Sequence, residues 1–304
     1  MPSETSRTVV VALAAGLGVA IAKLFAAIVT GSPAMTAEAS HSFADFANDL
    51  FLLVAQLRSH RAPDDEHPFG YGREAYFWAL LAALGAFLAG AAFSLREGIN
   101  SLIHPVATSS FLLAYVVLAV STVFDLVSFR QSVRQMVEGA RRNRRGVLAH
   151  AALTSDPMLR GVFNEDSVSI AGDLAAFAGL AISQGTGSSV PQGIAAVVVG
   201  LLLVRISLRM VRRNHDFLLG QPVPLAQQQQ VRDFLLARPE VTAVHQLLVT
   251  FLGPDQVWIL ARISVRPSLR ADEVAALVSD LDAGIHQASQ SVSRIDIITA
   301  GEGT

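Results

Sequence analysis

Hydrophobic positions dominate the first two thirds of the chain, in runs long enough to cross a lipid bilayer. A spanning helix needs about 20 mainly apolar residues. Six segments reach that length, so the pattern predicts transmembrane helices over residues 8–30, 34–57, 76–103, 109–138, 163–184 and 190–211. The predicted fold class is an integral membrane α-helical bundle of six helices.

The pattern changes after residue 225. "AQQQQVRDFLLARP" is typical of a short amphipathic helix, and "VTAVHQLLVTFLG" and "DQVWILARISV" are typical of two strands. "ADEVAALVSDLDAGIHQASQ" has helical spacing, and "VSRIDII" supplies a last strand. The order αββαβ predicts a small α+β domain at 226–304, joined by a linker at 214–225 to a transmembrane domain at 1–213.

The composition supports a membrane protein. The chain is 52% hydrophobic and 16% charged, whereas soluble domains carry about 25% charged residues. Its net charge of −2 argues against nucleic acid as a partner. Because there is no cysteine, any metal must be held by imidazole, carboxylate or carbonyl groups.

Arginines set the expected orientation. They flank the 58–73 loop, fill 141–145 and close the sixth span at 205–213, whereas "TGSPA" and "SQGTGSSVPQG" have no Lys or Arg. Basic residues accumulate in cytoplasmic loops. We therefore expect a multi-pass protein of the cell membrane with both termini in the cytoplasm.

The second span carries an unusual set of polar residues. His41 and Asp45 are four apart, so they share one helix face. Asn48 lies near that face, and Asp49 follows Asp45 by four. A charge inside a membrane helix costs about 2.5–3.5 kcal/mol on insertion scales, so these residues need a compensating function.

The fifth span carries a second acidic group. It contains Glu165, Asp166 and Asp173. Asp166 and Asp173 face the same way but are separated by about 10 Å along a helix axis. One ion cannot easily be shared across that distance, so we expect only one of the two to join the pair on the second span.

Imidazole and carboxylates from two helices suit a divalent transition metal. Zinc takes such ligands in tetrahedral geometry, and histidine shifts preference toward zinc, cobalt or iron. Metal binding must displace protons from these groups, so a mobile site of this kind exchanges a metal ion for protons. The competing interpretation is a set of hydrogen bonds between helices.

Several segments together resemble the cation diffusion facilitator family of zinc/proton antiporters. They are "HSFADFAN" after "TAEAS", "HPFGYGREAYFWALL", "REGINSLIHP", "SFRQSVRQ", "NEDSVSIAG" and "VHQLLVTFLGPDQVWILARISV". The resemblance covers nearly the whole chain. It implies a homodimeric six-helix transporter with its transport site between the second and fifth spans and a ferredoxin-like cytoplasmic domain.

The resemblance also implies specific ligands. His41 and Asp45 match the family's pair on the second span, and Asp166 matches its aspartate on the fifth. The family's further ligand is replaced here by Val162. Water or one of four side chains must then complete the shell: Glu165, Asn48, Asp49 or Asp173.

The C-terminal part departs further from the family pattern. His245 matches one zinc-binding histidine of the family's cytoplasmic domain, but Ala261 stands at a second ligand position. We interpret His245 as a strand residue with a hydrogen-bond partner. In "DDEHPFGYGRE", His67 either captures metal or belongs to a polar turn, and the turn is favoured.

Two charged residues of other spans each allow two interpretations. Lys23 snorkels or pairs with an acidic residue. Asp125 either supports the site or pairs with Arg130.

The sequence thus predicts a secondary transporter that exports a divalent cation, zinc first, in exchange for protons. No GxxxxGK[ST] motif indicates ATP drive, no prosthetic group is expected, and the protein is not expected to be an enzyme. The alternatives are a membrane-anchored metal sensor or scaffold and, less favoured, an intramembrane metal-dependent hydrolase. The sequence leaves open whether zinc, iron, cobalt or manganese is the ion.

Overall fold

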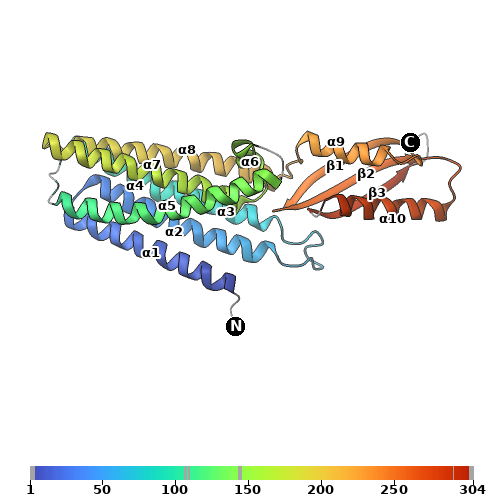
Figure 1. The fold of residues 1–304 in the computed structure, drawn as a ribbon, viewed down its shortest axis with the longest axis horizontal. Coiled ribbons are helices and arrows are strands. Elements are labelled where there is room, and N and C mark those ends of the chain that lie inside the picture. Colours follow the sequence, from blue (N-terminus) through green and yellow to red (C-terminus); the bar gives the residue numbers. More distant parts are fainter. Residues whose placement is uncertain (1–3, 106–107, 109, 143–145, 290, 301–304) are drawn as a thin grey trace. The chain divides into compact units, whose positions relative to one another are not determined.

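The computed structural model describes residues 4–105, 108, 110–142, 146–289 and 291–300. The chain forms two compact units (Figure 1). The membrane unit comprises Met1–Leu57 and Phe77–His215, and the C-terminal unit comprises Arg58–Tyr76 and Asp216–Thr304. The loop between the second and third predicted spans therefore belongs to the C-terminal unit. Arg144 and Arg145, which entered the orientation argument, lie outside the described residues.

The membrane unit is helical. Its long helices are α1 (Glu4–Thr30), α2 (Pro33–Ser59), α5 (Phe111–Arg142), α7 (Pro157–Thr186) and α8 (Val190–Leu218). A further span consists of α3 (Glu74–Ala86), a π-helical turn (Phe87–Ala91) and α4 (Ala92–Ile103). The sequence pattern did not predict α6 (Val147–Leu153), because a helix of seven residues is too short to show a clear period.

Within the described residues, five helical segments are long and apolar enough to cross a membrane. They are Leu13–Thr30, Glu74–Ile103, Phe111–Arg141, Pro157–Thr186 and Val190–Leu218. α2 has 27 residues, but Glu38, Asp45 and Asp49 make it too polar to qualify. The protein is therefore a multi-pass membrane protein, and α2 as its sixth span stays a prediction.

Local sequence fixes the ends of α7, which carries the acidic residues of the predicted site. Asp156 caps its first turn by accepting hydrogen bonds from the backbone N–H groups of Met158 and Leu159, at 2.9 and 3.2 Å. Pro157 follows at the first helical position. Gly187 ends the helix with a φ of 69°, a conformation that suits glycine.

The C-terminal unit contains the predicted order of elements. These are α9 (Leu225–Leu236), β1 (Val241–Gly253), β2 (Gln256–Val265), α10 (Ala271–Ala288) and β3 (Val292–Ala300). The sheet order is β1-β2-β3, with β1 antiparallel and β3 parallel to β2 (Figure 1). The order αββαβ is confirmed, whereas the ferredoxin-like topology stays a prediction.

Alternate residues of β2 are buried and contribute to the hydrophobic core of this unit. Ile259, Ala261 and Ile263 are fully buried and pack with Leu235 of α9 and Leu281 of α10. Side chains at every second strand position point to the same face, so these three residues lie together against the helices.

The 58–76 loop packs on this core. Tyr76 stacks on Phe217 with ring centroids 4.7 Å apart. The ring of Phe69 lies 5.5 Å from that of Trp258. The 58–76 segment is therefore held within the C-terminal unit by Phe217 and by Trp258 of β2.

Candidate metal site

His41 and Asp45 face each other on α2. The Nε2 atom of His41 lies 3.2 Å from Oδ2 of Asp45. Ser169 of α7 contacts both residues, with its Oγ 3.0 Å from His41 Nε2 and 3.5 Å from Asp45 Oδ2. The imidazole is 1% exposed, and its Nδ1 atom has no hydrogen-bond partner among the described residues. The predicted pair therefore sits where α2 meets α7.

Glu165 joins this group from α7. Asn48 donates a hydrogen bond to its carboxylate, which also lies in hydrogen-bonding contact with the carboxyl group of Asp45. Two carboxyl groups in contact need a proton or a cation between them. A small cavity of about 20 Å³ is lined by His41, Asp45, Asn48 and Glu165, together with apolar residues such as Leu203 of α8.

Asp166, which the family resemblance favours, points elsewhere. Its Oδ1 accepts a hydrogen bond of 2.8 Å from Ser128 of α5. Asp49 is an exposed residue of α2 and does not line the cavity. The structure thus brings His41, Asp45, Asn48 and Glu165 around one cavity and leaves these two aspartates outside its lining.

Asp173 belongs to a second polar group. Its Oδ1 lies 3.3 Å from Nζ of Lys23, which also lies 3.0 Å from Oε2 of Glu38 and 3.7 Å from Oδ2 of Asp125. Lys23 therefore pairs with acidic residues, which is one of the two roles that the sequence suggested for it. Asp125 thus contacts Lys23, a partner that the sequence did not suggest for it.

The ligand atoms do not yet form a complete coordination shell. In the described part of the chain, no group of three His, Cys, Asp or Glu side chains is arranged to hold a metal ion. Binding of a metal ion therefore requires small side-chain shifts that bring the ligand atoms of this group closer together.

The remaining predicted histidines have protein partners. His67 Nδ1 lies 3.4 Å from Asp64 Oδ1, and Tyr71 donates a 2.7 Å hydrogen bond to Asp64. The Tyr71 hydroxyl in particular lowers the pKa of Asp64. His245 Nε2 lies 2.7 Å from the Ser264 hydroxyl, the kind of strand contact that the sequence predicts.

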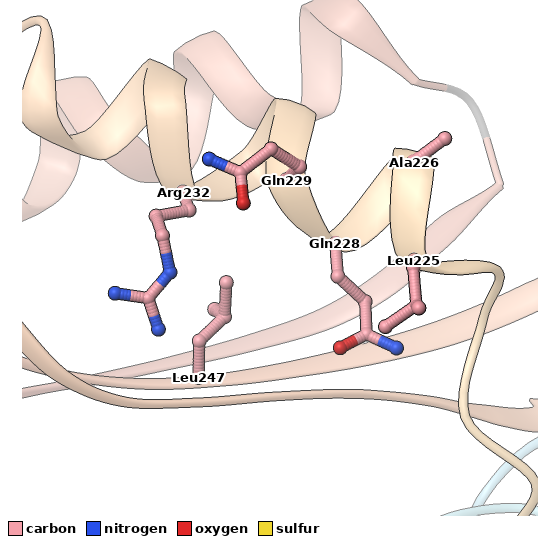
Figure 2. Close-up of a pocket in the computed structure, with 6 residues that line it drawn as sticks. All are labelled: Leu225, Ala226, Gln228, Gln229, Arg232 and Leu247. Atoms are coloured by element: carbon pink, nitrogen blue, oxygen red, sulfur yellow. The ribbon is translucent and has the colours of Figure 1, made fainter.

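The C-terminal unit has a larger open hollow of about 430 Å³ between α9 and β1 (Figure 2). Gln228 and Arg232 point from α9 toward the strand that carries Leu247. Arg232 donates a hydrogen bond to the carbonyl of Val244. The lining contains no carboxylate or imidazole, so its chemistry does not suit a divalent metal.

Sequence reasoning missed two residues near the site. Ser169 is four residues after Glu165 on α7, so the helical period places both on one face. Glu38 is three residues before His41 and is fully buried. A search for ionisable residues at three- and four-residue spacing within the second span would have found Glu38.

Comparisons with known proteins place the chain among cation transporters. A sequence profile described as the cation efflux transmembrane domain matches residues 9–219. The chain is 30% identical over 241 residues to the mitochondrial proton-coupled zinc antiporter SLC30A9 of Xenopus laevis, covering 79% of this chain and 43% of that protein.

Two further relatives come from a plant and a bacterium. Metal tolerance protein C4 of Arabidopsis thaliana is 29% identical over 234 residues, covering 77% of this chain and 51% of that protein. The cation-efflux pump FieF of Salmonella typhi is 27% identical over 253 residues, covering 83% and 78%. The chain therefore matches about half the length of the animal and plant relatives and most of the bacterial one.

Proposed function

The chain belongs to the cation diffusion facilitator family, and on that premise we propose that it exports zinc from the cytoplasm in exchange for protons. Members of the family are transporters of divalent cations and not enzymes. The hydrolase alternative is therefore excluded. The identity of the ion, the exchange for protons and the direction of transport are the parts that we propose.

One observation carries the proposal. The His41 imidazole, the Asp45 carboxylate and the Glu165 carboxylate meet at one cavity between α2 and α7. All three groups bind protons in one state and divalent cations in another. Each group can therefore release a proton when the ion arrives and accept one when the ion leaves.

The donor set favours zinc among the candidate ions. One imidazole nitrogen and two carboxylates form a three-ligand zinc site, and Asn48 or a water molecule supplies a fourth oxygen. A site made only of oxygen ligands would favour magnesium, calcium or manganese instead. Iron and cobalt share the preference for imidazole and are the competing cargoes to assay.

The expected cycle follows from these groups. With the site open to the cytoplasm, deprotonated His41, Asp45 and Glu165 take the ion. The bundle then reorients, and protons from the other side compete for the same atoms and release it. We propose both termini in the cytoplasm of a cell-membrane protein, and a homodimer as the working assembly.

Reconstitution of the full chain into liposomes tests the function. We expect zinc to accumulate in the vesicles only when a pH gradient drives protons outward, and to stop when an ionophore collapses that gradient. Substitution His41→Ala should lower the initial rate at least tenfold. The matched control is His245→Ala, because His245 lies on β1 and contacts Ser264; this variant should keep the wild-type rate.

Other results would refute the proposal in different ways. Zinc binding without flux would favour the sensor alternative. Flux that does not respond to the pH gradient would remove the proton exchange. Cobalt or iron flux well above zinc flux would change the cargo.

A further inference from the structure

The group around Lys23 is built from four helices. Lys23 of α1 lies between Glu38 of α2, Asp125 of α5 and Asp173 of α7, with its Nζ 3.0–3.7 Å from one oxygen of each. The Lys23, Glu38 and Asp173 side chains are 1% exposed or less. We call these four residues the Lys23 group. The cavity lining of the candidate metal site does not include them.

Lys23 is the only lysine in the sequence, and every other basic residue apart from histidine is arginine. An ammonium is a compact charge with three donors, whereas a guanidinium is a wide planar fork. A single point-like cation surrounded by three carboxylates therefore has the arrangement of a bound metal ion among oxygen ligands.

The carboxylates have spare capacity for a cation. Among the described residues, Oε1 of Glu38 and Oδ2 of Asp173 are buried without a hydrogen-bond partner. Gly172 leaves the space for Glu38, because a Cβ atom there would lie 2.8 Å from Oε1. One ammonium faces three acids, so removal of Lys23 would leave three acids without the cation that they share.

The Lys23 group lies on one side of the candidate metal site along the helices. Glu38 is one turn from His41 toward the turn that joins α1 to α2, and Asp173 is displaced from Glu165 in the direction of the end of α7 at Thr186. One further turn along, Ala26, Met35 and Ala176 are buried in an apolar cluster. In the proposed orientation this end of the bundle faces outward, so an exported ion leaves past the Lys23 group.

We propose that Lys23 is a tethered cation that occupies a second carboxylate site and so prevents the exported divalent ion from being trapped there. This inference rests on the proposed export of a divalent cation. Conduction requires sites that bind an ion weakly enough to release it. Without Lys23, the two buried carboxylates of Glu38 and Asp173, together with the partly exposed one of Asp125, would hold a divalent ion too firmly, and the ammonium makes the site unavailable.

Metal stoichiometry tests this role directly. Full-length wild-type protein and Lys23→Met are dialysed against Zn²⁺, and bound metal is measured by elemental analysis. We expect Lys23→Met to bind one more ion per chain than wild type and to transport zinc at least tenfold more slowly. A purely structural role for Lys23 would lower transport without adding a metal ion.

Two matched variants locate the additional ion. Lys23→Met combined with Glu38→Gln and Asp173→Asn should return to the wild-type stoichiometry, because the ligands are neutralised. Lys23→Arg keeps the positive charge and should not gain an ion. An unchanged stoichiometry in folded Lys23→Met overturns the inference, and so does an additional ion that persists in the triple variant.

The role of Lys23 can be tested even if Lys23→Met does not fold. If Lys23→Met is not monodisperse after purification, Lys23→Gln replaces it, because its amide can donate to the carboxylates. If both variants fold only when Zn²⁺ is present, the second site is supported. If Zn²⁺ rescues neither, the inference is overturned.

The outcome is separable from that of the proposed function. Wild-type zinc flux together with unchanged binding in Lys23→Met overturns only the role of Lys23. An additional ion in Lys23→Met without any wild-type flux overturns only the export function.

Discussion

Asn48 of α2 donates a hydrogen bond to the carboxylate of Glu165 on α7 and so directs an acidic side chain toward the cavity that His41 and Asp45 line. Asp166, which follows Glu165 in the chain, instead accepts a hydrogen bond from Ser128 on α5. Adjacent residues on a helix are about 100° apart, so these two carboxylates face different helices. This difference separates the residue that the structure favours from the one that the family resemblance favours.

We therefore predict that Glu165→Gln weakens zinc binding more than Asp166→Asn does. Glu165→Gln removes a carboxylate from the cavity, and we expect a loss of at least tenfold in affinity, which corresponds to about 1.4 kcal/mol. Asp166→Asn keeps a hydrogen-bond acceptor for Ser128, and we expect a change below threefold. Isothermal titration of zinc into each purified variant measures both. The opposite ranking would assign Asp166 as the ligand.

The sequence predicts the helices well but cannot rank these two acids. The long apolar runs define their own helices, and the paired residues His41 and Asp45 are identified by their spacing. Glu165 and Asp166 are adjacent, however, and the choice between them depends on the rotation of α7 against α2 and α5. That rotation is set by packing between helices that are distant in sequence.

The contacts of the Lys23 group could not be predicted from the sequence either. The sequence shows that Lys23 is a single charged residue within an apolar run. Its three partners come from α2, α5 and α7, and no local spacing links them to α1. The 58–76 loop is similar, because its sequence indicates a polar turn but not its contacts with Trp258 and Phe217.

A second prediction concerns Ser169, whose hydroxyl contacts both His41 and Asp45. Ser169→Ala should weaken zinc binding severalfold but not abolish it, since one neutral hydrogen bond contributes about 0.5–1.5 kcal/mol. Titration of zinc into the variant measures the effect, with Ser167→Ala as control because Ser167 bonds the backbone carbonyl of Phe163 on its own helix. Loss of all zinc binding in Ser169→Ala would instead make Ser169 a direct ligand.

A third prediction concerns Gly72, where the 58–76 loop approaches the sheet closely. A Cβ atom on Gly72 would lie 2.8 Å from the Leu252 carbonyl oxygen and 3.0 Å from Gly253 Cα, both backbone atoms. Gly72→Ala should therefore destabilise the C-terminal unit by about 1–3 kcal/mol, as overpacking usually does. A lowered thermal midpoint in the tryptophan fluorescence of the full chain would show this.

Gly146 provides the matched control for Gly72. Nothing lies within 4 Å of a Cβ atom built there, and its φ of −67° suits any residue. Gly146→Ala should keep the wild-type midpoint. Equal midpoints for Gly72→Ala and wild type would mean that the loop does not pack on the sheet as described.

A last prediction uses Asp296 of β3, which accepts hydrogen bonds from the Trp258 indole at 2.6 Å and from Arg294 Nε at 2.9 Å. The Arg294 hydrogen bond, followed by that of Trp258, lowers the pKa of Asp296. Since its folded pKa lies below the unfolded value of about 3.9, its contribution to stability is present above that pH. The contribution is lost as the pH falls through the folded pKa.

Trp258 reports this titration itself. The sequence has two tryptophans, so a Trp78→Phe background leaves Trp258 as the only indole. We expect its emission to change as the pH falls below about 3.9, the ordinary aspartate pKa, and Asp296→Asn to remove that change. The amide oxygen of asparagine can still accept from the indole, so the variant tests the charge on Asp296 and not the hydrogen bond alone. A pH-dependent emission that survives in Asp296→Asn would assign the titration to another group.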